Sequence, residues 1–223
     1  MMPTERPELA ADAEELREQL RHVYWIGGGS ATGKSTIARR IAAERGLQHY
    51  ATDDVMPDHS KRSTPECCPL LHEFMAMDMD ERWVNRSPNA MLETFHWFRG
   101  EGFGMIIEDI LRLPKEPALI TDGFRLLPHL VKPLLTVRSH ALWLLPTPEF
   151  RQAVVDSRGG PKWGFLGKTR DPERALHNLL ERDAMFTHHL YEEAKRLELN
   201  IIEVDTTMTV DDLARRVTDA LVL

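Results

Sequence analysis

The fold is decided by Gly28-Gly29-Ser30-Ala31-Thr32-Gly33-Lys34-Ser35, which fits the phosphate-loop pattern G-x-x-x-x-G-K-[ST] at every fixed position. The preceding residues, 22–26, form a short apolar run with β-branched and aromatic side chains, which predicts a buried strand. Residues 36–43 follow with helical periodicity. A strand, a glycine-rich loop and a helix therefore come in the order that this kind of loop requires.

The chemistry of this loop predicts a bound nucleotide. The glycines let successive backbone N–H groups turn inward, and the helix beginning near Gly33 adds its positive end. We expect Lys34 to reach the β- and γ-phosphates, Ser35 to bind Mg²⁺, and Thr36 to contact the α-phosphate or to pack. The predicted cofactors are thus ATP and Mg²⁺. The predicted nucleotide contacts are Gly28, Gly29, Ser30, Ala31, Thr32, Gly33, Lys34, Ser35 and Thr36.

Length and composition restrict the class of protein. A chain of 223 residues can bury a full core, and we expect one domain over residues 1–223. The net charge of −7 argues against a nucleic-acid partner, and no apolar run approaches membrane-spanning length. We therefore expect a cytoplasmic protein, as a monomer or homodimer. Cys67 and Cys68 are too few for a disulfide framework and are expected to be reduced.

The rest of the chain alternates strand and helix patterns. An amphipathic helix is expected in the N-terminal extension 1–21, where apolar residues recur at intervals of three and four. Four further strands are predicted, at 47–51, 117–123, 140–145 and 200–204. Helices are predicted over 148–157, 171–197 and 210–221. This alternation indicates an α/β fold with a parallel sheet.

Two of these strands end in carboxylates. Asp53 and Asp54 follow the second strand and Asp122 ends the third, and ligands of open α/β sheets gather at the carboxyl ends of strands. Asp53 is the candidate base for an attacking hydroxyl and a substrate contact, with Asp54 as the alternative and helix capping as the structural explanation. Asp122 is the candidate to bind Mg²⁺ or the loop serine, near the substrate.

A long segment, 56–113, lacks strand patterning and is rich in Met, His, Trp and Phe. Helices are predicted at 91–98 and 103–113, and the segment is too long for one crossover helix. We interpret it as a helical acceptor-binding region, with Arg86 as a substrate contact. The other polar and aromatic candidates for its pocket are Arg82, Trp83, His96, Trp97, Arg99 and Glu108.

Residues 158–171 form a glycine-rich basic segment in an otherwise acidic protein. This composition predicts a mobile lid whose cations close over a transferring phosphoryl group, although a disordered basic loop has the same composition. Arg158 in this segment and Arg182 in the following helix are the candidate catalytic arginines, and Arg182 adjoins Asp183.

With these motifs together, residues 22–223 resemble the nucleotide- and small-molecule-kinase branch of the P-loop proteins. That branch includes adenylate-, shikimate- and gluconate-kinase-like enzymes and the chloramphenicol phosphotransferase-like group. The resemblance implies a three-layer fold with a five-stranded parallel sheet in the order 2-3-1-4-5. It also implies that Lys34 and Ser35 serve phosphates and Mg²⁺, that Asp53 contacts or deprotonates an acceptor hydroxyl, and that Arg158 and Arg182 bind phosphate. The lid lacks the cysteine cluster of some adenylate kinases.

Three functions are consistent with the sequence. The first is transfer of the ATP γ-phosphoryl group to a hydroxyl of a small metabolite, nucleoside or antibiotic. The second is a nucleoside monophosphate kinase, which Arg62, Arg82, Arg86 and Arg99 keep open. The third is a nucleotide-dependent regulatory switch, which ranks last because the chain has no Asn-Lys-x-Asp guanine signature.

Overall fold

The computed structural model describes residues 7–223, and their side chains from residue 13 onward. Its sheet has five strands, all parallel, in the order β2-β3-β1-β4-β5. The predicted α/β fold and strand order are therefore confirmed. The strands are β1 (Val23–Gly28), β2 (Gln48–Ala51), β3 (Leu119–Asp122), β4 (Ala141–Pro146) and β5 (Asn200–Val204).

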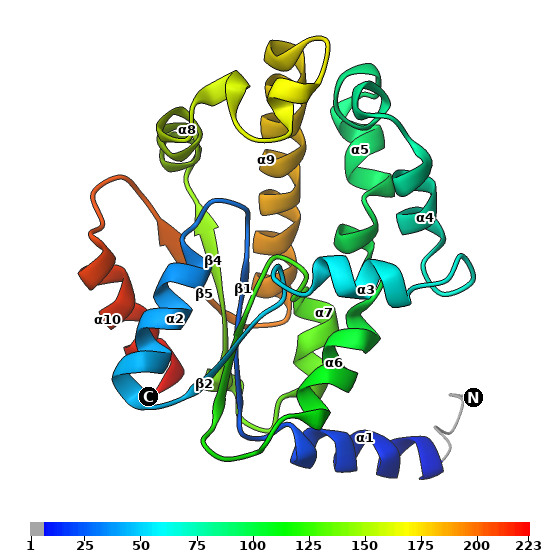
Figure 1. The fold of residues 1–223 in the computed structure, drawn as a ribbon. Helices are drawn as coiled ribbons and strands as arrows, with labels where there is room; N and C mark the ends of the chain where they lie inside the picture. The colour runs from blue at the N-terminus through cyan, green and yellow to red at the C-terminus, as the bar shows by residue number, and fades with distance from the viewer. Residues whose placement is uncertain (1–6) are drawn as a thin grey trace.

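Helices cover both faces of this sheet, so the molecule has three layers (Figure 1). α2 (Lys34–Arg45) and α10 (Val210–Leu221) lie on one face. The other face carries α6 (Phe103–Arg112), α7 (Pro128–Val131) and the long α9 (Pro172–Arg196). The N-terminal helix α1 (Pro7–Gln19) leads into β1, and its last turn donates from Arg17 Nε to the carbonyl of Pro133 at 2.6 Å. None of the described helices has the length and apolar character needed to cross a membrane.

The core follows the alternation of side chains along the strands. Trp25 and Trp143 are fully buried against α6 and α9, whereas their neighbours Ile26 and Leu142 are buried against α2 and α10. Both faces of the sheet are therefore apolar, as a parallel sheet between two helical layers requires. The strong apolar runs in the sequence reflect this double burial.

The segment between β2 and β3 is helical, as predicted: α5 (Pro88–Thr94) stands beside α9, whereas α6 lies against the sheet (Figure 1). Its second predicted helix is close to α6, but the first, 91–98, is divided. α5 ends at Thr94, Phe95 is extended with ψ 105°, and a 3₁₀ helix follows. The elements of the segment are α3 (Met56–Arg62), α4 (Pro69–Ala76), a π-helical turn (Glu81–Asn85), α5 (Pro88–Thr94), the 3₁₀ helix His96–Arg99 and α6.

The basic segment after α8 (Pro148–Ser157) is folded as two short 3₁₀ helices, Gly160–Lys162 and Leu166–Lys168. Leu166 is fully buried in a cluster with Trp83 and α9 residues, and the ring of Phe165 lies 4.5 Å from that of Trp83. The backbone N–H of Arg170 also donates to Asp80 at 2.8 Å. In this structure the segment is thus docked on the helical region.

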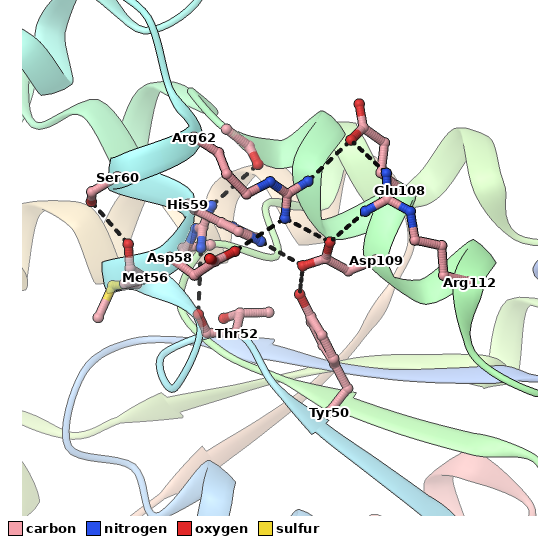
Figure 2. Close-up of polar contacts among 12 residues, drawn as sticks. Tyr50, Thr52, Met56, Asp58, His59, Ser60, Arg62, Glu108, Asp109 and Arg112 are labelled. Carbon is pink, nitrogen blue, oxygen red and sulfur yellow. Dashed lines mark hydrogen bonds and ion pairs between the residues drawn. The ribbon is translucent and has the colours of Figure 1, made fainter.

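A polar network joins the helical region to the sheet (Figure 2). Asp109 on α6 accepts hydrogen bonds from Tyr50 on β2 at 2.9 Å and from Arg62 on α3 at 2.8 Å. His59 Nε2 lies 2.6 Å from the same carboxylate, and the His59 side chain has no exposed surface. Burial works to raise the pKa of Asp109, but these three hydrogen bonds outweigh it and lower the pKa to about 2. The network therefore fixes α3 and α6 over the end of β2.

Candidate active site

The phosphate-loop residues form a tight turn between β1 and α2. Gly28 and Gly33 have φ angles of 134° and 77°, and Ala31 also has a positive φ of 66°. A Cβ atom on Gly28 would lie 2.0 Å from the carbonyl oxygen of Leu144, so only glycine fits there. The turn brings backbone N–H groups and the start of α2 to one place, which is the arrangement that binds anions.

The ammonium group of Lys34 is enclosed by this loop. It donates to the carbonyl of Gly29 at 2.5 Å and to the hydroxyl of Thr32 at 3.2 Å, and the side chain is buried. Burial lowers the pKa of Lys34, whereas the charges of Asp53, Asp122 and Asp183 act to raise it. These carboxylates come from the turn after β2, from the end of β3 and from α9, so the charges of three separate segments act on one lysine.

Ser35 and Asp122 are paired at the start of α2. The Ser35 hydroxyl donates to Asp122 Oδ2 at 2.6 Å, and Asp122 is almost fully buried. The other carboxylate oxygen, Oδ1, lies 2.7 Å from His49 Nε2 on β2. A hydroxyl and a carboxylate are the oxygen donors that Mg²⁺ prefers, so the predicted pair has suitable chemistry for that ion. No group of three His, Cys, Asp or Glu side chains suited to a metal occurs among residues 13–223.

Asp53 lies beside this pair because the ends of β2 and β3 are in register. Ala51 is opposite Asp122, and the Thr52 backbone N–H donates to the Asp122 carbonyl at 2.9 Å. A Cβ atom on Gly123 would lie 1.7 Å from the Thr52 hydroxyl and 3.3 Å from Asp53 Oδ1, so a glycine is needed for the close approach of the two strand ends.

The charge state of Asp53 is set by its surroundings. Burial raises the pKa of Asp53 and nearby Asp122 adds to the rise, while Lys34 opposes it. Asp54, the alternative base, is exposed. A partly buried carboxylate with a raised pKa beside a phosphate loop has the properties of a general base, and Asp53 has them more clearly than Asp54.

The two predicted catalytic arginines lie on the lid side of the site. Arg158 follows α8, is exposed, and stacks over the ring of Trp163 at 4.9 Å, and its positive charge acts on the pKa of Lys34. Arg182 is buried on α9 and donates twice to Asp183 Oδ1, at 3.0 and 2.7 Å. Its guanidinium also lies 4.6 Å from the ring centre of Phe95. The charges of Asp53, Asp183 and Arg158 all act on the pKa of Lys34, and Arg182 is hydrogen-bonded to one of them, Asp183.

Arg86 has a different environment. It donates to the Ala90 carbonyl at 2.9 Å and to the Thr94 hydroxyl, both on α5. The role of Arg86 as a substrate contact stays a prediction.

Sequence reasoning did not find three polar residues near the site, namely His49, Arg125 and Arg151. Arg125 is buried, donates to the Thr52 carbonyl at 3.4 Å and stacks 4.0 Å from the Trp97 ring. Burial lowers its pKa to about 10. The signal for Arg125 was its position two residues after Gly123, at the same strand end as Asp122. Arg151 lies one turn into α8 and is also buried, although nothing in its local sequence distinguishes it from a surface arginine.

A cavity of about 170 Å³ adjoins the phosphate loop at Ser30 and Ala31. Its walls come from the helical region, the loop after β3, the basic segment 158–171, α8 and α9, and most of them are aromatic or aliphatic. Arg151, Arg182 and Asp183 are its charged members. The remaining lining residues are Trp83, Phe95, Phe98, Phe124, Val155, Trp163, Phe165, Leu179 and Leu180.

The chain was compared with known proteins. No protein-family model matches it, and no curated protein matches it significantly. Among solved structures it is similar to a gluconokinase from Sinorhizobium meliloti 1021, with 16% identity, a TM-score of 0.45, and coverage of 91% of this chain and 92% of that one. It is also similar to an uncharacterized protein from Eubacterium ventriosum ATCC 27560, with 13% identity, a TM-score of 0.46, and coverage of 89% and 97%.

Proposed function

We propose that this protein is an ATP- and Mg²⁺-dependent phosphotransferase that moves the γ-phosphoryl group to a hydroxyl of a small molecule. The observation that carries the proposal is the surroundings of Lys34. Its ammonium group lies inside the phosphate loop, the next residue Ser35 is hydrogen-bonded to Asp122, and the paired ends of β2 and β3 bring Asp53 to the same edge of the sheet. A nucleotide-binding lysine and a candidate base thus share one centre, which phosphoryl transfer to a hydroxyl requires.

The roles follow from the groups present. Bound ATP with Mg²⁺ supplies the activated phosphoryl group. The loop N–H groups and Lys34 bind and orient the phosphates, while Ser35 and Asp122 hold the metal ion or a water bound to it. Asp53 orients the acceptor hydroxyl and takes its proton as the new oxygen–phosphorus bond forms and the bond to ADP breaks. Arg158 and Arg182 offset negative charge on the transferring group and exclude water.

The alternative of a nucleoside monophosphate kinase has less support. Such an enzyme needs arginines free to bind the acceptor phosphate. Arg62 pairs with Asp109, Arg82 donates to the Phe74 carbonyl at 3.0 Å, and Arg86 donates to α5. Of the four arginines that kept this function open, only Arg99 has no side-chain hydrogen bond among the described residues.

The test is a mass-spectrometric screen with ATP, Mg²⁺ and pools of nucleosides, nucleoside monophosphates, sugars and hydroxylated antibiotics. The folded Lys34→Ala variant is the blank. A mass gain of one phosphoryl group on an acceptor, absent from the blank, is the expected result. Phosphorylation confined to the monophosphate pool would favour the alternative kinase. Bound ATP with no acceptor modified in any pool would contradict the proposal and favour a regulatory switch.

A further inference from the structure

The cavity beside the phosphate loop has walls that restrict what can enter it. It touches Ser30 and Ala31, two of the four variable positions of the phosphate loop. A molecule bound in the cavity can therefore place its reacting end next to the proposed phosphoryl group. The proposed base Asp53 is not itself a lining residue, but it lies against Gly123, and the next residue, Phe124, lines the cavity. An acceptor hydroxyl can thus approach the phosphate loop from this cavity. The inference that the bound molecule is the acceptor rests on the proposed function.

The aromatic walls come from separate parts of the chain and pack against one another. Phe95 lies 4.7 Å from Phe98 and 6.5 Å from Phe124, measured between ring centres. On the lid side, Phe165 lies 4.5 Å from Trp83. Rings in these arrangements offer faces and edges on which another ring can stack. A cavity of about 150 Å³ with apolar walls accepts benzene, and this one measures about 170 Å³, so its size suits one ring with a short substituent.

The charged part of the wall is small and positive. Arg182 uses Nε and Nη2 on Asp183, while Nη1 is buried without a protein partner among the described residues. Arg151 donates from Nη2 to the Thr187 hydroxyl. Two arginines and one carboxylate leave a formal excess of one positive charge at the cavity. This balance disfavours an ammonium group, and it offers a buried donor to an oxygen of the bound molecule.

We propose that this cavity binds the ring of an aromatic alcohol, neutral or anionic, as the phosphoryl acceptor. Packing against the apolar walls formed by Phe95, Phe124 and Trp83 holds the ring, and the hydroxyl points toward the phosphate loop. Arg182 Nη1 donates to an oxygen at the boundary between acceptor and phosphoryl group. Cationic amino sugars are rejected by the positive wall. Polyhydroxylated acids are rejected because several of their hydroxyls would be buried against apolar rings without a partner.

The test compares binding of four probes to the full chain in the presence of Mg²⁺ and a non-hydrolysable ATP analogue. Three share a ring and a hydroxymethyl group: benzyl alcohol, meta-(hydroxymethyl)benzoate and meta-(aminomethyl)benzyl alcohol. The fourth is gluconate. Ligand-observed NMR titrations give the affinities, and mass spectrometry with ATP reports phosphoryl transfer to the same probes. Leu180→Trp fills the cavity from α9. His177→Trp places the same side chain on the exposed face of that helix, three residues earlier, as the control.

We expect benzyl alcohol and the benzoate to bind at least about tenfold more tightly than the other two probes. That binding should be lost in Leu180→Trp and kept in His177→Trp, with both variants folded by circular dichroism. Absence of saturable binding by the aromatic probes, equal binding of the cationic probe or gluconate, or binding unchanged in Leu180→Trp would overturn the proposal. Phosphorylation of gluconate without aromatic binding would overturn it and leave the proposed function standing. Aromatic binding in the cavity with no transfer to any acceptor would leave an aromatic-binding site, but it would overturn the acceptor role and contradict the proposed function.

Discussion

Ser35 donates its hydroxyl hydrogen to Asp122 Oδ2 at 2.6 Å, and this bond joins the first turn of α2 to the end of β3. Both residues offer oxygen donors next to the enclosed ammonium of Lys34. The second oxygen of Asp122 lies 2.7 Å from His49, so the carboxylate is held on both sides. Two neighbours fixing one carboxylate is the arrangement that orients a ligand of a metal or of its bound water.

We predict that Asp122→Asn lowers the apparent affinity for Mg²⁺ in nucleotide binding. The amide carries no negative charge and cannot accept the Ser35 hydrogen bond with its nitrogen. The apparent affinity for Mg²⁺ should fall by about 10- to 100-fold, as measured by titrating Mg²⁺ against ATP binding. The exposed Asp54→Asn is the matched control. An unchanged Mg²⁺ titration in Asp122→Asn would remove this residue from the metal site.

We predict that Asp53→Asn leaves ATP binding nearly intact but slows phosphoryl transfer by about 100-fold or more, because the general base is lost. In the wild type the rate should fall with decreasing pH as Asp53 becomes protonated. Because burial raises its pKa, this loss should begin above the pH expected for an ordinary aspartate. Mass spectrometry of reactions quenched at successive times, repeated over a pH series, measures both effects. A rate close to wild type in Asp53→Asn would mean that the base lies elsewhere.

The same substitution should stabilise the protein at neutral pH. A carboxyl group whose pKa is higher in the folded state than in the unfolded state costs stability when it is ionised. This cost is present at neutral pH and disappears as the pH falls below the unfolded pKa of about 3.9. Asp53→Asn should therefore raise the Tm at pH ~7 and lose that advantage near pH ~4. If the Tm of Asp53→Asn at neutral pH were equal to or lower than that of the wild type, ionised Asp53 would not destabilise the fold, which contradicts the prediction.

The parts of the candidate site that could be predicted from the sequence are the residues within one short motif and the residues at the ends of strands. The phosphate loop sets Lys34 and Ser35 next to each other. Parallel strands end on one edge of the sheet, so Asp122 at the end of β3 and Asp53, two residues after β2, lie at the same edge. The order of the strands came from the resemblance to P-loop kinases and not from periodicity.

The remaining parts depend on packing between distant segments. Trp83, Phe124 and Phe165 meet in one cavity although they lie in the helical region, a strand-end loop and the lid. No period in the sequence indicates which aromatic residues face one another. Arg125 was missed because a charged residue is expected at the surface, whereas here stacking on Trp97 and hydrogen bonds to backbone carbonyls offset its burial. The predicted helix 91–98 is split at Phe95, whose ring packs against Phe98 and against Phe74 of α4, and the sequence period does not indicate the contact with Phe74.

The network of Asp109 leads to a prediction about stability. Asp109→Asn removes the charge that three donors share, and it leaves the fully buried His59 and the hydroxyl of Tyr50 with a weaker partner. The free energy of unfolding at pH ~7 should fall by about 1–3 kcal/mol, because the asparagine amide nitrogen cannot accept and three donors then compete for one oxygen. Asp58→Asn is the matched control, because exposed Asp58 pairs with the same Arg62 at 3.2 Å and should contribute little.

The effect of pH on this network has a definite sign. The pKa of Asp109 is lowered to about 2 in the folded state. Its contribution to folding stability is therefore complete above its pKa in the unfolded state and is lost as the pH falls toward 2. Burial lowers the pKa of His59, which also reduces stability as the pH falls below the ordinary histidine value. The free energies of unfolding of wild type and Asp109→Asn in urea should therefore begin to converge below pH ~4 and meet near pH 2. A difference between the two proteins that stays constant from neutral pH to acid would show that Asp109 acts through packing alone.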